Sequence, residues 1–437
     1  MTASASWAMC FEKVVYLTGL RESSSARHIP AMPAPRLNPF HALRHRNFRL
    51  FFFGQGTSLI GTWMQNIAQG WLVLELTNSP FDVGLVSALG SLPILLVSLP
   101  AGVFVDRVNK HRLIILTQTL SLLQALVLAI LIWTHAIALW QVAVIALFLG
   151  TVNAFDTPGR QAFIVELVGK EDLMNAIALN SSAFNAARVV GPSIAGVLIA
   201  AVGLAWCYFF NAVSYVAVIW GLLEMRLPPF VRPERPGDAM EQFREGARFV
   251  RRDRRVLALV SLMGAISIFG FPFLVLMPVF ARDVLRVGAS GLGFMMAATG
   301  IGAVTAALAL AAFGPRVRKG ALLVWTGPIF GAAIVLFAVT RWLPAVLVIL
   351  AVCGGAMILN NAVTNTLIQT LVPDGLRGRV MGVYAFVFLG MAPFGALQAG
   401  WLAERLGAPA AVFIGGSLCV VASLTMWRNV PEVPLLK

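Results

Sequence analysis

The sequence predicts an all-α polytopic membrane protein, with about 12 transmembrane helices in two pseudo-symmetric six-helix bundles. Three observations carry this prediction: the composition, the recurrence of long apolar runs, and the placement of basic residues. Of the 437 residues, 59% are hydrophobic and 12% are charged, and the mean hydropathy is +0.83. Soluble domains carry about 25% charged residues. A soluble fold of this length cannot bury so much apolar surface.

Each apolar run is about 20 residues long, which is the length that a helix needs to cross a hydrocarbon core of about 30 Å. Lipid offers no hydrogen-bond partner to a free backbone amide or carbonyl. Runs rich in Leu, Ala, Phe and Gly without strand alternation are therefore expected to be helices. The expected spans are residues 49–74, 82–104, 113–134, 138–158, 174–201, 205–225, 257–280, 290–313, 320–340, 343–369, 380–403 and 408–428.

The formal net charge of +14 is concentrated in alternate connections between these spans. By the positive-inside rule such connections face the cytoplasm. This predicts a multi-pass protein of the cytoplasmic (inner) membrane, with both termini and the long central loop in the cytoplasm. The charge is therefore interpreted as a topology signal, and nucleic acid is not an expected partner. The basic clusters lie at residues 36–49, 107–112, 226–255, 316–319 and 377–379.

The chain divides into four segments. Residues 1–38 are rich in Ser and Pro and are expected to be a disordered cytoplasmic N-terminus. Residues 39–226 and 256–430 each hold six spans, and short matches relate the two halves: residues 191–196 resemble 392–395, and residues 166–168 resemble 370–372. Residues 227–255 are expected to be a cytoplasmic linker with an interfacial helix, whose apolar face carries Phe243, Ala247, Phe249 and Val250.

The connection at residues 102–112 is the most diagnostic stretch of the chain. It places one acid and three permanent cations between two apolar spans, in a connection too short to form a domain. A tight charged turn between two membrane helices indicates a moving part. The residues that we expect to form this moving part are Gly102, Asp106, Arg107, Lys110 and Arg112.

Residues 102–112 resemble motif A of the major facilitator superfamily, which lies between helices two and three. Residues 191–196 are similar to the Gly-Pro motif in helix five of its exporters, and residues 156–161 after the fourth span add to the resemblance. Over about residues 38–430 the chain resembles the secretion-effector branch of this superfamily. That branch includes enterobactin exporters and macrolide efflux pumps.

The resemblance implies secondary active export of small amphipathic molecules, such as a siderophore, drug or metabolite, by alternating access with proton coupling. It also implies that Asp106 latches the outward-facing state by meeting the positive N-terminal end of helix eleven, near residues 379–382. The three cations would hold Asp106 in place and meet the anionic leaflet. The alternative is a topogenic basic loop with an incidental acid. The equivalent stretch of the second half, residues 314–319, has no acid, so a single latch is expected.

Polar residues inside the spans define a candidate substrate cavity. They are costly in lipid, so they are expected to serve either function or contact between helices. Amides beside aromatic rings suit a large amphipathic ligand, because rings supply contact area and amides fix orientation. The alternative is hydrogen bonding between helices, and the asparagines of the tenth span lie toward the cytoplasmic end, where they could form a gate. The candidates are Thr62, Gln65, Asn66, Gln69, Asn185, Arg188, Asn361 and Asn365.

Arg188 is expected near the bilayer centre, because it lies about 21 Å along its helix at 1.5 Å per residue. An uncompensated Arg at that depth costs about 2.5–3.5 kcal/mol even on insertion scales. It must therefore face a wet cavity or a partner. Two interpretations stay open: an anion or hydrogen-bond site for substrate, or a structural tie to helix carbonyls or to a carboxylate.

Two further groups also have two interpretations each. Asp156 and Arg160, at the end of the fourth span, could couple transport to protons or form a helix-end salt bridge, and the salt bridge is favoured. Gly191, Pro192 and Gly196 could form a hinge in the fifth span or allow close packing of helices.

Other classes of protein are disfavoured. Uptake or lipid movement by the same fold is the main alternative to export. The sequence has no P-loop, HExxH or Ser/His/Asp arrangement, so neither an enzyme nor an ATP-driven pump is expected. The four cysteines lack metal-ligand spacing, so no metal or cofactor is expected. The expected partners are a small-molecule substrate, a proton and membrane lipids, and the chain is expected to act as a monomer.

Overall fold

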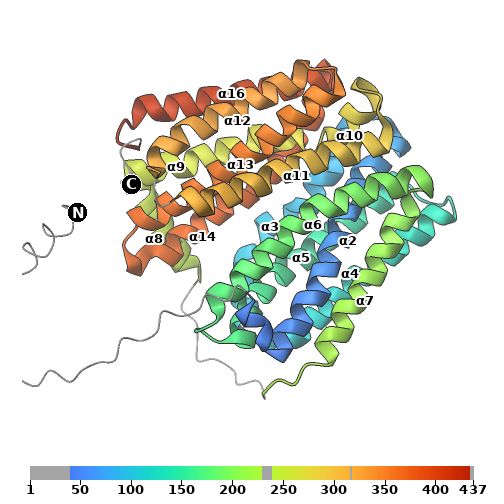
Figure 1. The fold of residues 1–437 in the computed structure, drawn as a ribbon, viewed down its shortest axis with the longest axis horizontal. Helices are drawn as coiled ribbons and strands as arrows, with labels where there is room; N and C mark the ends of the chain where they lie inside the picture. Colours follow the sequence, from blue (N-terminus) through green and yellow to red (C-terminus); the bar gives the residue numbers. More distant parts are fainter. Residues whose placement is uncertain (1–39, 229–238, 315–316, 434–437) are drawn as a thin grey trace, which may run out of the picture. The chain divides into compact units, whose positions relative to one another are not determined.

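The computed structural model describes residues 40–228, 239–314 and 317–433. These residues form helices and no strand, and the helices fall into two groups (Figure 1). Each group holds six membrane-crossing segments, which confirms the predicted fold class. The segment expected to be disordered, residues 1–38, and part of the linker, residues 229–238, lie outside the described residues.

The first half contains one short 3-10 helix and six long helices. Their bounds are η1 His41–Arg44, α2 Arg46–Thr77, α3 Pro80–Arg107, α4 Lys110–Trp133, α5 Leu139–Val168, α6 Leu173–Ala201 and α7 Leu204–Leu223. The helix starts follow from local chemistry. The Ser79 side chain accepts from the amide of Asp82 at the start of α3, and Asn109 does the same for Arg112 at the start of α4.

The second half begins with the amphipathic helix α8, Ala239–Arg252. Its membrane-crossing segments are α9 Arg254–Ala265 with its continuation to Val284, α11 Gly288–Phe313, α12 Lys319–Val339, α13 Leu343–Leu371, α14 Asp374–Gly390 with α15 Ala392–Leu406, and α16 Ala408–Asn429. Helix α8 packs on α14, where the rings of Phe243 and Phe386 lie 5.3 Å apart and Glu245 pairs with Arg379.

Eleven of these segments are long and apolar enough to cross a membrane by composition alone. The twelfth is α2, which has 32 residues and packs along α6 and α7. Its amides, including Gln55, Gln65, Asn66 and Gln69, make it less apolar than its neighbours. The helix that contributes most amides to the centre of the molecule is therefore the one that hydropathy detects least well.

The helices run between two ends. We call the end with the α2–α3 connection at residues 78–79 the first-loop end, and the end with the α3–α4 connection at residues 108–109 the second-loop end. The connections at residues 134–138, 202–203, 285–287 and 340–342 also lie at the first-loop end. Those at residues 169–172 and 372–373 lie at the second-loop end.

Two crossing segments are broken, although the sequence predicts single helices for both. In the seventh, α9 passes into a π-helical turn (η2, Ile266–Gly270), a 3-10 turn (η3, Phe271–Phe273), the short α10 (Met277–Val279) and a second π-helical turn (η4, Phe280–Val284). Pro272 and Pro278 lie there, and proline lacks the amide that continues a helix. In the eleventh, the break falls at Met391, two residues before Pro393. By contrast, α6 continues through Pro192.

The two halves meet along two helix pairs: α6 packs against α11 (Figure 1), and α3 packs against α15. Both crossings use glycine on each helix. A Cβ on Gly196 would lie 2.9 Å from the Cα of Gly293, and a Cβ on Gly84 would lie 2.9 Å from the Cα of Gly400. Small residues at such positions let two backbones touch. All four glycines lie in the half of the molecule near the first-loop end.

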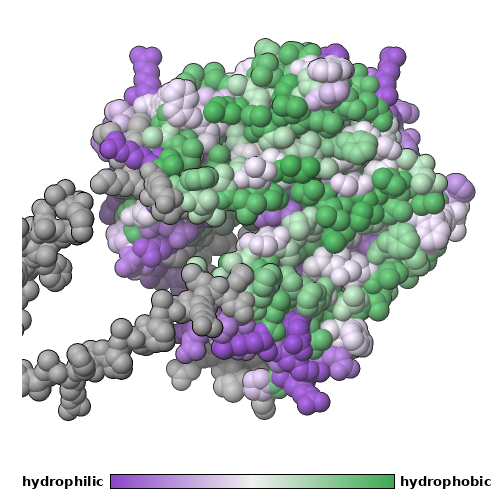
Figure 2. Space-filling model, viewed as in Figure 1, coloured by the Kyte–Doolittle hydropathy of each residue, from purple (hydrophilic) through white to green (hydrophobic). Residues whose placement is uncertain are grey.

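Figure 2 shows apolar side chains over most of the visible face, with hydrophilic side chains gathered near its edges. Many large apolar residues are exposed on this protein, among them Trp140, Trp220, Trp325 and Val348. In a soluble protein an apolar surface of this extent would drive aggregation. In a bilayer it contacts lipid chains, as the multi-pass prediction requires.

Candidate functional site

A cavity of about 330 Å³ lies between the two halves, in the part of the molecule near the first-loop end. Helices α2, α3 and α5 form its wall in the first half, and the broken seventh segment with α11 forms its wall in the second half. Most of its lining is apolar. The polar and aromatic lining residues are Trp63, Asn66, Gln69, Ser87, Ser91 and Asn153.

Of the four polar residues that the sequence proposes on α2, two line this cavity: Asn66 and Gln69. Gln65 points elsewhere and is 2% exposed. Its side chain donates to Gln124 Oε1 at 3.2 Å and accepts from Asn211 Nδ2 at 2.6 Å, so it ties α2 to α4 and α7 inside the first half. Thr62 also faces this interior: its hydroxyl donates to Ser58 O within α2 and lies 3.4 Å from the Tyr215 hydroxyl of α7. For Gln65 and Thr62 the structure matches the alternative of hydrogen bonding between helices.

Three cavity residues are absent from the sequence candidates: Ser87, Ser91 and Asn153. Ser87 and Ser91 stand four residues apart, so they share one face of α3. Asn153 stands on α5, three residues before Asp156. Serine is a weak signal in an apolar span because its hydroxyl can bond to its own helix, as Ser91 does to Ser87 O at 3.0 Å.

Arg188 lies in the middle of α6, 15 residues from its start, at about 22 Å for a rise of 1.5 Å per residue. Its guanidinium carbon stands 5.8 Å from the centroid of the Trp63 ring, and its Nη2 lies 3.9 Å from Met357 Sδ on α13 of the other half. No acid in the described part of the chain pairs with it. A cation–π contact contributes about 0.5–2 kcal/mol, which does not offset the cost of a guanidinium at this depth.

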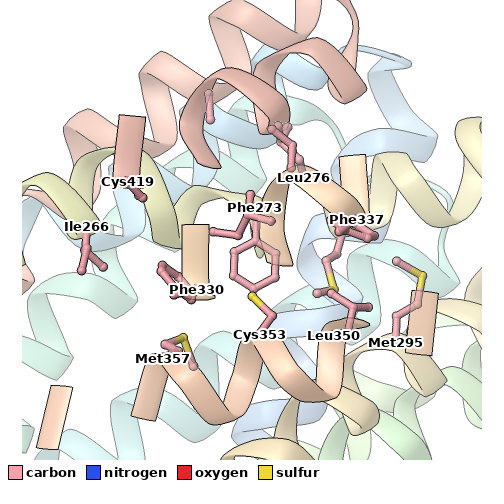
Figure 3. Close-up of a cluster of buried hydrophobic side chains, with 14 of the residues drawn as sticks. Ile266, Phe273, Leu276, Met295, Phe330, Phe337, Leu350, Cys353, Met357 and Cys419 are labelled. Carbon is pink, nitrogen blue, oxygen red and sulfur yellow. The ribbon is translucent and has the colours of Figure 1, made fainter. Parts of the chain in front are cut away.

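Polar residues connect Arg188 with the second-loop end. On α6, Asn185 lies one turn closer to that end and donates to Ser181 O at 2.8 Å. On α13, Asn361 and Asn365 follow Met357 on the same face. Asn361 accepts a hydrogen bond from Tyr384 of α14 at 2.8 Å, and Asn365 accepts from Gln369 at 2.5 Å. Met357 itself lies on α13 with Cys353, below Phe330 in a buried apolar cluster to which both halves contribute (Figure 3).

Asp156 forms a buried network within the first half. One carboxylate oxygen accepts from Thr117 Oγ1 at 2.6 Å and from Gln118 Nε2 at 3.0 Å, and the other pairs with Arg160 Nε at 2.7 Å. Asp156 is 2% exposed. The carboxylate thus ties α4 to α5, as the favoured salt-bridge interpretation expects. It is also the one buried acid within a crossing helix among the described residues.

The second half has uncharged residues at the positions that correspond to this network. By the internal repeat that aligns residues 166–168 with 370–372, Asn360 and Thr364 of α13 correspond to Asp156 and Arg160. Both are buried, and within the described residues their side chains have no hydrogen-bond partner. Gly327 faces Asn360, since a Cβ there would lie 3.3 Å from Asn360 Nδ2. The charged network is therefore a property of the first half.

The residues of the 102–112 stretch do not contact helix α14 through hydrogen bonds or ion pairs in this structure. Asp106 and Arg107 are exposed, and Asp106 has no polar partner among the described residues. Lys110 pairs with Glu166 of α5 at 2.8 Å, while the side chain of Arg112 is exposed and a Cβ on Gly102 would meet nothing within 4 Å. The predicted latch belongs to the outward-facing state, and it stays a prediction.

At the first-loop end, two charged side chains of the second half cap helices of the first half. Arg282 Nη1 donates to Leu74 O at 2.7 Å and to Asn78 Oδ1 at 2.8 Å, at the negative C-terminal end of α2. Glu404 Oε2 accepts from Ser79 Oγ at 3.1 Å and from the amide of Phe81 at 3.3 Å, at the positive N-terminal end of α3. Each charge is opposite in sign to the helix end that it meets.

The proposed hinge residues of the fifth span lie at helix crossings. A Cβ on Gly191 would lie 2.6 Å from the Cβ of Trp63 on α2, and Gly196 meets Gly293 on α11. Helix α6 is unbroken from Leu173 to Ala201 through Pro192. This geometry matches the close-packing alternative, and the hinge stays a prediction.

Residues 37–434 match the family described as transmembrane secretion effector. The chain belongs to this family. It is 29% identical over 368 residues to the multidrug efflux pump Tap of Mycolicibacterium fortuitum, covering 82% of this chain and 89% of that protein. It is 26% identical over 343 residues to the enterobactin exporter EntS of Escherichia coli O1:K1 / APEC, covering 78% and 81%.

Solved structures agree on the fold of this secretion effector. A bacterial homologue of the human lysosomal transporter Spinster superposes with a TM-score of 0.67, at 15% sequence identity, over 90% of this chain and 96% of that chain. The family and the fold confirm the resemblance to the major facilitator superfamily, the multi-pass membrane location and a transport function for small molecules. They also confirm that this protein is a transporter and not an enzyme.

One ionic cluster of this secretion effector lies away from the cavity, at the second-loop end. Asp172, in the α5–α6 connection, accepts hydrogen bonds from His45 at 2.6 Å, from His41 at 2.8 Å and from Arg44 at 2.8 Å. The hydrogen bonds from His45 and His41 and the charge of Arg44 lower the pKa of Asp172 from 3.8 to about 2. The cluster fastens η1 beside the start of α6.

Proposed function

We propose that this secretion effector exports small amphipathic molecules across the cytoplasmic (inner) membrane by alternating access, coupled to proton entry. The observation that carries the proposal is the cavity between the halves, which joins an apolar wall to the amides of Asn66, Gln69 and Asn153 and to the Trp63 ring. Such a mixture suits a ligand with a large apolar body and a few polar groups. The relatives named as an efflux pump and an exporter support the outward direction.

The proposed orientation places the second-loop end and both termini in the cytoplasm. The connections at that end carry the basic clusters of residues 107–112 and 377–379, whereas those at the first-loop end carry few cations. Cytoplasmic loops are enriched in Lys and Arg. In this orientation the cavity near the first-loop end lies toward the outside. The contacts of Arg282 and Glu404 then close the outer side.

Alternating access is supported by where the halves touch. The described hydrogen bonds between the halves lie at the first-loop end, at Arg282 and Glu404, or at mid-depth, at Arg188. The exposed Asp106 at the opposite end is free to meet α14 after the halves rock. We propose that a single chain, which holds both halves, performs this movement as a monomer.

Proton coupling needs an acid that changes its protonation during the cycle. Asp156 is the candidate, because it is buried within a crossing helix and already exchanges hydrogen bonds with Thr117, Gln118 and Arg160. The single change Asp156→Asn would leave Arg160 without its ion-pair partner and could destabilise the protein for that reason alone. The double change Asp156→Asn with Arg160→Gln removes both charges and is the better test.

Inside-out vesicles test the proposal. We expect members of a panel of siderophores, macrolides and dyes to release protons from acidified vesicles and to accumulate inside them, as read by a pH-sensitive dye and by substrate uptake. The double variant should let substrate equilibrate across the membrane, without concentrating it and without proton release. Accumulation with undiminished proton release in that variant would exclude Asp156 as the carrier. Movement of lipid headgroups without proton flux would instead support a flippase, and accumulation only in right-side-out vesicles would support an importer.

A further inference from the structure

We infer that Arg188 is the recognition point for an acidic group of the substrate, so that the molecules exported are amphipathic organic monoanions. This inference rests on the proposed function and specifies its substrate class. Arg188 touches both halves, since its helix α6 belongs to the first half and its guanidinium contacts Met357 of the second. A ligand bound there would interact with a residue that contacts both halves, so its binding can affect their relative position.

The partners of Arg188 leave its hydrogen-bonding capacity almost unused. A guanidinium offers five N–H donors in a planar fork that matches a carboxylate. Among the described residues, the guanidinium meets only the face of Trp63, at 5.8 Å from the ring centroid, and the weak acceptor Met357 Sδ, at 3.9 Å. The one buried carboxylate of the described crossing helices, Asp156, is already held by Arg160. The structural tie that the sequence also allows, to helix carbonyls or to a carboxylate, is therefore absent among the described residues.

The surroundings of Arg188 are polar on one side and mostly apolar on the other. Toward the second-loop end, α6 carries the exposed Ser181 and the half-buried Asn185, and α13 carries the half-buried Asn361 and Asn365. Toward the first-loop end, Trp63 borders both Arg188 and the cavity of about 330 Å³. An acidic group on the guanidinium would thus place an aromatic or aliphatic body against Trp63 and the apolar cavity wall.

The charge balance limits the ligand to one negative charge. Arg188 is a single cation, and the other cation inside a crossing helix of this region, Arg160, is neutralised by Asp156. Burying a second, uncompensated negative charge in a low-dielectric cavity is costly. A carboxylate or phenolate on an apolar body fits this site, whereas a dianionic phosphate monoester does not.

Equilibrium binding to the purified full-length protein in detergent tests the inference without requiring transport. The probes are radiolabelled naphthoate, its neutral analogue naphthamide, and naphthyl phosphate at about pH 8, where a phosphate monoester is a dianion. We expect naphthoate to bind about tenfold tighter than either analogue, because only naphthoate presents a single negative charge to the guanidinium of Arg188. Arg188→Gln should remove the preference for naphthoate over naphthamide, and Arg188→Lys should keep part of it.

Arg405→Gln is the matched control. Arg405 also lies over a tryptophan, with its guanidinium carbon 5.1 Å from the Trp401 ring centroid, but it stands at the exposed end of α15. This variant should keep the preference for naphthoate. Unfolding temperature supplies a second readout: if Arg188 serves recognition, Arg188→Gln should unfold at or above the wild-type temperature, because a half-buried charge without an acidic partner is removed.

Four outcomes would overturn the inference. These are a naphthoate preference that survives in Arg188→Gln, equal binding of naphthoate and naphthyl phosphate, no naphthoate binding to the wild type, or a lower unfolding temperature of Arg188→Gln than of the wild type. The proposed export function fails separately. A protein that binds naphthoate through Arg188 but moves no substrate in vesicles would keep the anion site and refute export.

Discussion

The crossing of α6 and α11 offers a direct test of how the first-loop end closes. In the change Gly196→Ala, the new Cβ would lie 2.9 Å from Ala289 O and 2.9 Å from the Cα of Gly293. Real Cβ atoms essentially never approach to within 3.0 Å, and ordinary contacts begin near 3.4 Å. Both atoms belong to the backbone of the other half, so neither can rotate away. The two helices must separate by about half an ångström or more.

The expected magnitude follows from this overlap. Overpacking a tight contact costs about 1–3 kcal/mol, and the cost applies only while the two halves touch at this end. Since 1–3 kcal/mol corresponds to a change of about 5- to 150-fold in an equilibrium, Gly196→Ala should shift the population toward conformations that are open at the first-loop end. Replacing glycine by alanine also stabilises a helix by about 1 kcal/mol. A control must therefore be a Gly→Ala change in a helix where the new Cβ meets no neighbouring atom.

Gly56→Ala in α2 is that control, because its Cβ would meet nothing within 4 Å. Spin labels on cysteines introduced at Thr134 and Thr340, at the first-loop ends of α4 and α12, would report the separation of the halves by electron–electron distance measurement. We expect the longer-distance population to grow in Gly196→Ala and to stay at the wild-type level in Gly56→Ala. An unchanged distribution in Gly196→Ala would refute the assignment of this crossing to the outer closure. A loss of stability with an unchanged distribution would mean that the crossing persists in every state.

Three further predictions use other contacts. Arg282→Gln removes the charged hydrogen bonds to Leu74 O and Asn78, whose loss should destabilise the closed first-loop end by about 1–2 kcal/mol. The distances between the spin labels should therefore lengthen, and shorter distances would contradict a role of Arg282 in closure. Asp106→Asn should reduce transport in vesicles while membrane insertion stays normal, because it removes the acid of the predicted latch; unimpaired transport would remove that role. For Asp172, the lowered pKa of about 2 means that its stabilising contribution is complete above its ordinary value of 3.8 and is lost as the pH falls through about 2. The difference in unfolding temperature between wild type and Asp172→Asn should therefore persist as the pH falls to about pH 4 and shrink below it, and a difference that starts to shrink near pH 6 would point to another group.

The sequence predicted well those features that depend on short stretches of chain. Span number and fold class follow from apolar run length and composition, and these properties are local. Arg188 was placed near mid-membrane by counting residues along one helix, which requires no knowledge of its neighbours. The pairing of Asp156 with Arg160 followed from their spacing of four residues, since such residues share a helix face.

The breaks in the helices were harder to predict. Proline marks many positions here, yet α6 passes through Pro192 unbroken while the eleventh segment breaks at Met391. Whether a helix tolerates proline depends on which neighbouring groups satisfy the freed carbonyls. Those neighbours come from distant parts of the chain.

Apolar run length and the weak repeat are enough to establish that this chain crosses the membrane about twelve times in two related halves. The sequence also shows which polar residues lie within the spans and are therefore candidates for lining a cavity. Tertiary structure alone decided which of them face that cavity. Gln65 and Asn66 are adjacent in sequence, but one ties α2 to α4 and α7 while the other lines the space between the halves. Successive residues on a helix point about 100° apart, so the rotation at which α2 packs, and no property of α2 itself, assigns each amide to a structural or a substrate-facing role.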